Sequence, residues 1–82
     1  MSPEFPNTVE IPESWTRCEI HNFKGPVRGT IYSLLEAGML SRIEGGVINI
    51  FPARELKMDL YRLRIELEEV KSFDPSAEIL FF

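Results

Sequence analysis

The fold is decided by residues 40–51, LSRIEGGVINIF, which predict a β-hairpin near the middle of the chain. Polar and apolar residues alternate around Gly45-Gly46, and paired glycines adopt the positive φ angles of a two-residue hairpin turn at little cost. The turn sets the register and therefore which side chains face the core. The predicted pairs are Ile43 with Ile48 and Ser41 with Ile50 toward the core, and Arg42 with Asn49 and Leu40 with Phe51 away from it.

Working outward toward the N-terminus, residues 15–23 predict a strand and residues 26–38 predict a short helix. In the strand, apolar and polar residues alternate, which is typical of a half-buried strand. Pro26 suits the first helical position, and Gly38 supplies a left-handed cap. The expected positions are Thr16, Cys18 and Ile20 on the core side of the strand, Arg17, Glu19 and His21 on its other side, and Val27, Ile31, Leu34 and Leu35 at helical spacing.

Working outward toward the C-terminus, residues 52–72 predict a long helix with two apolar faces, and residues 78–82 predict a last strand. At about 100° per residue, the apolar positions fall into two nearly opposite stripes. One face serves the chain's own core, so the other needs a second surface. The first stripe contains Leu56, Leu60, Leu63, Leu67 and Val70, and the second contains Met58, Tyr61 and Ile65.

The predicted order is strand, helix, strand, strand, helix, strand. This order favours a ferredoxin-like α+β sandwich, in which a four-stranded antiparallel sheet carries two helices on one face. Residues 15–82 form this single domain, and residues 1–14, with three of the six prolines, form an extended arm.

The composition favours one folded cytoplasmic domain and contains no motif for catalysis, a metal or a cofactor. The 82 residues carry a formal net charge of −4 and a pI near 4.9, so nucleic acid and anionic membranes are poor default partners. Cys18 is the only cysteine, which excludes an internal disulfide and indicates a reducing compartment, and we expect it to be a buried, inert thiol. Neither a signal peptide nor an apolar run of about 18 residues is present.

The second apolar stripe of the long helix is the leading candidate for a binding site. Aromatic and methionine side chains are favoured at the centres of protein interfaces, and charged residues at their rims. Three interpretations remain open: a partner covers the stripe, the arm covers it through Phe5, Val9 or Ile11, or the residues are simply tolerated at the surface. The first predicts a protein-interaction module, such as an adaptor, inhibitor or accessory subunit, that binds a partner protein or a second copy. Its residues are Met58, Tyr61 and Ile65, with Lys57 and Arg64 at the rim.

The open face of the predicted sheet supports an alternative function. Five residues would present basic and aromatic groups on which single-stranded bases stack: Arg17, His21, Arg42, Asn49 and Phe51. The predicted topology resembles that of RNA-recognition motifs, and the resemblance implies a nucleic-acid-binding sheet face. The strand at residues 47–51 lacks the basic-Gly-aromatic signature of that family, so the resemblance is one of topology.

Overall fold

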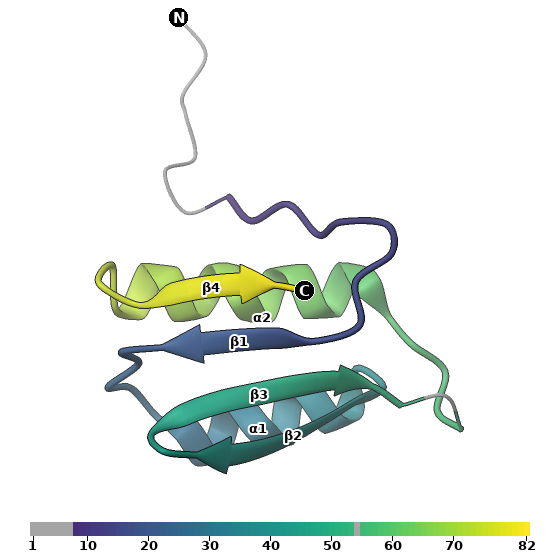
Figure 1. Ribbon diagram of the computed structural model, residues 1–82, viewed down its shortest axis with the longest axis horizontal. Helices are drawn as coiled ribbons and strands as arrows, with labels where there is room; N and C mark the ends of the chain where they lie inside the picture. Colours follow the sequence, from purple (N-terminus) through teal and green to yellow (C-terminus); the bar gives the residue numbers. More distant parts are fainter. Residues whose placement is uncertain (1–7, 54) are drawn as a thin grey trace, which may run out of the picture.

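The computed structural model describes residues 8–53 and 55–82, so the predicted arm lies only partly within the described residues. The helices and strands follow the predicted order along the chain (Figure 1). They are β1 (Cys18–His21), α1 (Val27–Glu36), β2 (Met39–Glu44), β3 (Val47–Pro52), α2 (Leu60–Phe73) and β4 (Glu78–Phe81).

The four strands form one antiparallel sheet in the order β2-β3-β1-β4. The hairpin of β2 and β3 has the predicted register, from the glycine turn down to the pair Leu40 and Phe51. β1 lies inside the sheet, where Cys18 is opposite Ile50 of β3 and Phe81 of β4. This strand order, with both helices on one face, confirms the ferredoxin-like arrangement.

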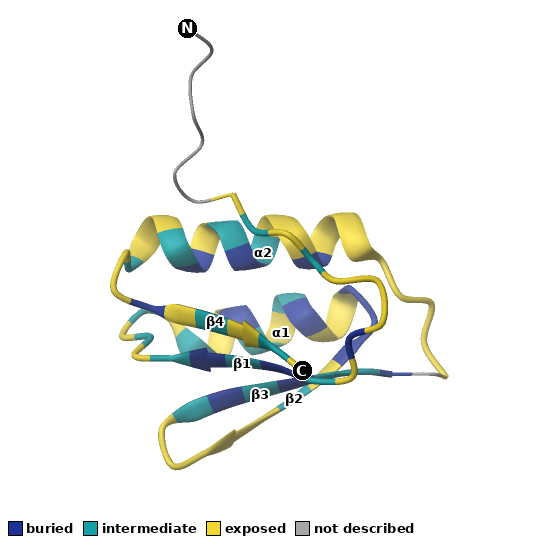
Figure 2. Cartoon of the chain, turned by 45° about the horizontal axis from the view of Figure 1, so that its top comes forward, coloured by how far each residue is buried: buried dark blue, intermediate teal, exposed yellow. Residues whose placement is uncertain are grey.

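The core lies between the sheet and its two helices. In Figure 1, α1 lies behind β2 and β3, and α2 lies behind β4. The buried sides of the helices face the sheet, as Figure 2 shows. The largest fully buried side chains are Ile20, Leu34, Met39, Ile50, Leu63, Leu67, Val70 and Cys18. No helix in residues 8–53 and 55–82 has both the length and the apolar composition needed to cross a membrane.

β1 is shorter than the predicted strand at residues 15–23, and Thr16, expected on its core side, is exposed before the strand begins, whereas within β1 the alternation is as expected. Cys18 and Ile20 are buried toward the helices, and the polar residues between and after them face outward. Trp15 precedes the strand and is buried with its ring edge-on to Phe81, 5.7 Å between centroids. Asn22, with φ +60°, ends the strand because this left-handed conformation breaks the extended backbone.

Gly38 follows α1 and allows the segment before α2 to cross over it. Its φ is +86°, the left-handed conformation predicted for the cap. A Cβ atom here would lie 2.5 Å from the carbonyl oxygen of Lys57. Backbone hydrogen bonds hold both ends of the crossing: the Ala53 N–H donates to the Gly38 carbonyl at 3.0 Å, and the Asp59 N–H donates to the Ala37 carbonyl at 2.8 Å.

α2 begins later than predicted. The predicted start at Pro52 is wrong, because Pro52 is the last residue of β3 and pairs with Met39. The helix starts at Leu60, directly after Asp59, whose carboxylate accepts a hydrogen bond from the Arg62 N–H at 3.1 Å. This N-cap satisfies one of the donors that a first helical turn leaves free, so it stabilises the helix end at this position.

Four apolar residues on the predicted core faces are exposed, among them Leu35 of α1, which is 47% exposed. Leu56 lies before α2, and Leu60 is the first residue of that helix, so neither belongs to the buried stripe. Ile43 lies on the same face of the hairpin as buried Ile48, but its exposed fraction is 52%. The reason is its place in the sheet, because β2 is an outermost strand and has a neighbour on one side only.

Candidate functional site

The outer surface of α2 presents Tyr61 and Ile65 to solvent. Tyr61 is 64% exposed and Ile65 is 37% exposed, and they lie one turn apart. The opposite side of the helix carries the buried residues Leu63, Leu67 and Val70. Within α2, the predicted opposition of two apolar faces is therefore confirmed for these residues.

Met58 and Lys57, the other predicted members of this site, do not belong to the helix. Both precede α2 and lie in the segment that crosses over Gly38, where they are exposed. Their predicted position on the helix is wrong, because α2 begins only after Asp59. They lie close along the chain to the first turn of α2, at the same end of the helix as Tyr61.

The described part of the N-terminal arm lies along one flank of α2. The Val9 N–H donates a hydrogen bond to the Glu68 carboxylate at 3.3 Å. The side chains of Val9 and Ile11 are partly buried against the core. The arm therefore covers the side of α2 that carries Glu68, whereas Tyr61 and Ile65 remain exposed.

An open groove separates the arm from the first two turns of α2. Its volume is about 630 Å³, and its walls are arm residues 8–11 on one side and Leu60, Tyr61 and Arg64 on the other. Tyr61 stands at the border between this groove and the outer surface. Phe5, the remaining arm residue predicted to cover this face, lies outside the described residues.

The charged rim of this surface is only weakly paired. The Arg64 Nε lies 3.9 Å from the Glu68 carboxylate, near the limit for an ion pair, and its guanidinium lies 5.5 Å from the centre of the Tyr61 ring. On the other flank, Arg62 pairs with Glu36 of α1 at 3.5 Å. The Arg64 guanidinium is therefore positioned beside an exposed aromatic ring, with hydrogen-bonding capacity to spare.

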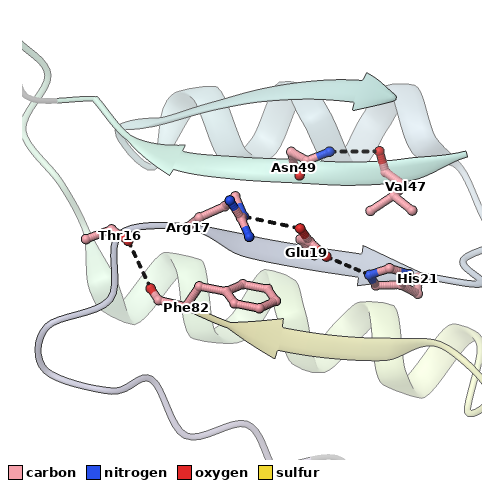
Figure 3. Close-up of polar contacts among 7 residues, drawn as sticks. All are labelled: Thr16, Arg17, Glu19, His21, Val47, Asn49 and Phe82. Carbon is pink, nitrogen blue, oxygen red and sulfur yellow. Dashed lines mark hydrogen bonds and ion pairs between the residues drawn. The ribbon is translucent and has the colours of Figure 1, made fainter. Parts of the chain in front are cut away.

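All five residues predicted for the open sheet face lie on β1, β2 and β3 or directly beside them, at the positions that alternate with the buried ones. Figure 3 shows Arg17 and His21 flanking Glu19. The Glu19 carboxylate is 3.2 Å from Arg17 Nε and 2.8 Å from His21 Nε2. On β2, Arg42 lies 3.4 Å from the Glu44 carboxylate. Each arginine of this face therefore has an acidic neighbour, so the face is mixed in charge and not a basic platform.

Sequence reasoning placed Glu19 on this face without recognising that it pairs with Arg17 and His21, and it missed Phe82. The Arg17 guanidinium lies 4.4 Å from the centre of the Phe82 ring, and the Phe82 carbonyl accepts a hydrogen bond from the Thr16 hydroxyl at 3.1 Å (Figure 3). The alternation of residues 78–82 was the available signal, since it places Leu80 and Phe82 on one side of the last strand.

The described side chains offer neither an activated thiol nor a group of metal ligands. Burial, with a smaller effect from the Glu19 carboxylate, raises the pKa of the Cys18 thiol to about 12. Such a thiol stays protonated at neutral pH and is a poor nucleophile and metal ligand. No three His, Cys, Asp or Glu side chains in residues 8–53 and 55–82 are grouped so that they would hold a metal ion.

Comparisons of the chain with protein-family models, curated proteins and solved structures gave no match.

Proposed function

We propose that this chain is a small protein-interaction module that binds a partner protein through the outer surface of α2. The residues of this docking surface are Tyr61 and Ile65 on the helix, Met58 before it, and the rim charges Lys57 and Arg64. The proposal assigns the chain the role of an adaptor, inhibitor or accessory subunit in the cytoplasm, without a catalytic activity.

The observation that carries the proposal is the exposure of Tyr61 beside a groove. Single apolar side chains are common on protein surfaces and need no partner. Tyr61 differs because Ile65 extends its apolar area along the helix, and the groove beside it offers space for an incoming side chain. Contiguous apolar surface next to a cavity is typical of binding sites, and tyrosine is frequent among residues that dominate binding energy.

The surface favours a partner with an apolar anchor and acidic neighbours. The groove between the arm and Leu60 is open to an incoming apolar side chain. Arg64 lines the groove and Lys57 precedes the helix at the same end, and the one carboxylate beside Arg64 within the described residues is the distant Glu68. A carboxylate of the partner would take the place of this weak contact and form a charge-assisted hydrogen bond with the guanidinium.

A matched pair of substitutions tests the proposal. Tyr61→Asp places a charge on the docking surface, and Tyr32→Asp places the same charge on α1 at a tyrosine that is 72% exposed. Both variants should retain the circular dichroism spectrum of the wild type, since neither ring is buried. The wild-type chain and both variants are first used to isolate binding proteins from a cell extract of the source organism. Each candidate that is identified is then purified, and its binding to the wild-type chain and to each variant is measured by calorimetry.

We expect the purified partner to bind the wild-type chain and Tyr32→Asp alike, and to bind Tyr61→Asp at least about tenfold more weakly. Ile65→Asp should have the same effect, and Arg64→Ala a smaller one. A partner that binds Tyr61→Asp as tightly as the wild type would refute this docking surface. The same conclusion follows if no purified candidate binds the wild-type chain.

A second candidate function is binding of single-stranded nucleic acid by the open sheet face. The observation in its favour is that two arginines lie next to aromatic rings, Arg17 at Phe82 and Arg42 at 5.8 Å from the centre of the Phe51 ring. The paired glutamates and the net charge of −4 weigh against it. Titration with single-stranded RNA and DNA at two salt concentrations decides, because salt-sensitive binding lost in Arg42→Ala or Phe51→Ala would reverse our ranking.

A further inference from the structure

β2 is an edge strand without a lysine, a proline or a bulge. It has six residues, and β3 is its neighbour on one side only. Natural edges are protected by charged side chains, above all lysine, by proline, by a bulge or by very short length, and of these β2 has only the charged residues Arg42 and Glu44. The β2 sequence MLSRIE contains neither lysine nor proline, and its pairing with β3 is continuous.

The opposite edge of the sheet differs from β2. β4 has only four residues. The ammonium group of Lys71 donates to the carbonyl of Ala77 at 2.8 Å and to that of Pro75 at 3.3 Å, directly before the strand begins. A short strand with a lysine bound to the backbone directly before it is a poor template for pairing with a second chain. The β4 edge and the β2 edge of the sheet are therefore not equivalent.

The hairpin register determines which backbone groups of β2 are free. In a two-residue hairpin the residues that flank the turn, here Glu44 and Val47, form a hydrogen-bonded pair, and the pairs alternate from there. Arg42 therefore bonds to β3. The N–H and C=O groups of Ser41 and Ile43 point away from β3, toward the free edge.

The free edge also carries apolar side chains. Ile43 is 52% exposed on the covered face of the sheet, and Leu35 of α1 is 47% exposed. α1 uses its other flank against α2, where Glu36 pairs with Arg62. Leu35 and Ile31 lie one turn apart on the flank away from α2, so with Ile43 they form an apolar strip along the β2 edge.

We propose that β2 pairs antiparallel with β2 of a second copy of this chain, about a two-fold axis through Ile43. The two Ile43 residues then exchange N–H to C=O hydrogen bonds, since these are the groups that face the free edge. Both copies of α1 come to lie on the same face of a continuous sheet, with the apolar strips against each other. The proposal concerns a different surface from the α2 docking surface and does not depend on it.

Charge complementarity selects this register among the possible ones. A two-fold axis at Ile43 places Arg42 opposite Glu44 of the second copy, and the symmetry provides this contact twice. Both residues are exposed on the open face in the single chain, where they pair with each other at 3.4 Å. A two-fold axis at Ser41 would instead place Arg42 opposite Leu40 and leave the charges unmatched.

Charge reversal combined with a measurement of mass tests the proposal. Arg42→Glu places two like charges opposite each other, and so does Glu44→Arg, whereas the double reversal R42E/E44R restores the match. Sedimentation velocity over a concentration series up to about 1 mM gives the dissociation constant for each variant. We expect a dimer for the wild type, dissociation constants raised at least about tenfold in each single variant, and recovery in the double variant.

Amide hydrogen exchange tests the register independently of the mass. The Ile43 amide should be slow to exchange at high protein concentration and fast at low concentration, whereas the Arg42 amide, bonded to β3, should be slow at both. A chain that is monomeric throughout the concentration series refutes the proposal. A dimer whose dissociation constant is the same in the wild type and in the charge-reversal variants also refutes it. A dimer abolished by Tyr61→Asp and unaffected by Ile43→Asp would show instead that copies associate through α2, and would also refute it.

Discussion

Replacing Gly38 with alanine tests the packing that positions α2. The left-handed backbone at φ +86° costs an alanine about 1 kcal/mol. The new Cβ would also lie 2.5 Å from the Lys57 carbonyl oxygen, which is backbone and cannot move without disturbing the hydrogen bonds that hold this crossing, and such overpacking costs about 1–3 kcal/mol. We therefore expect a total loss of about 2–4 kcal/mol, which for a domain of this size lowers Tm by about 10–25 °C.

Two other glycines supply matched controls for this measurement by thermal and urea denaturation. Gly45 has φ +58°, but a Cβ atom here would have no neighbour within 4 Å. Gly45→Ala should therefore lower the free energy of unfolding only by the cost of the left-handed backbone, about 1 kcal/mol. Gly29 lies inside α1 with open space around it, so Gly29→Ala should stabilise the fold by up to about 1 kcal/mol. If Gly38→Ala costs no more than Gly45→Ala, the segment before α2 does not cross Gly38 as described.

Three further predictions concern the core and the titrating groups. Leu67→Ala removes a fully buried side chain from α2 and should cost about 2–5 kcal/mol in urea denaturation; a loss below 1 kcal/mol would place Leu67 outside the core. Burial first, and then the neighbouring Glu69, raise the pKa of Glu66, so its charged form weakens the fold as the pH rises through that pKa. Glu66→Gln should therefore raise Tm relative to the wild type at about pH 7 and lose this advantage toward about pH 4, and a gain that is equal at both pH values contradicts the assignment. Burial, more than the Glu19 charge, holds the pKa of the Cys18 thiol at about 12, so a thiol reagent at mildly alkaline pH should react with Cys18 only after denaturant unfolds the chain; rapid labelling of the native protein would show that the thiol is accessible.

The fold was predictable from the sequence because its strongest local signals agree with each other. Gly45-Gly46 determines the hairpin register to the residue, and the alternation of Cys18 and Ile20 identifies the buried side of β1. The order of elements then leaves few topologies, since short connections favour antiparallel neighbours. Each of these signals acts over a few residues, which is the range in which sequence patterns are informative.

The start of α2 and the exposed edge were not predictable in the same way. Pro52 is compatible with a first helical position, and helical spacing accommodates Leu56 and Met58, so periodicity alone extended the helix backward. The competing signal was Asp59, an N-cap residue three positions before Arg62. The exposure of Ile43 follows from the order of strands in the sheet, which alternation within one strand does not contain.

The candidate site was predicted in part, for a similar reason. The direction of Tyr61 and Ile65 depends only on helical rotation relative to Leu63 and Leu67, so the sequence was sufficient. The groove exists because of the path that the arm takes along α2. That path is fixed by a long-range hydrogen bond between Val9 and Glu68. No local pattern in the arm indicates which flank of the helix it follows.

The two halves of the sheet close over very different lengths of chain. β2 and β3 join through two glycines, whereas the Thr16 N–H reaches the Phe82 carbonyl at 2.7 Å across a separation of 66 residues. Closing the longer loop costs about 2–3 kcal/mol more in chain entropy. We therefore expect the hairpin to form early and the seam between β1 and β4 to close last. In the native state, opening fluctuations should begin at that seam, so the face carrying Phe82 is the first to loosen when the protein is warmed.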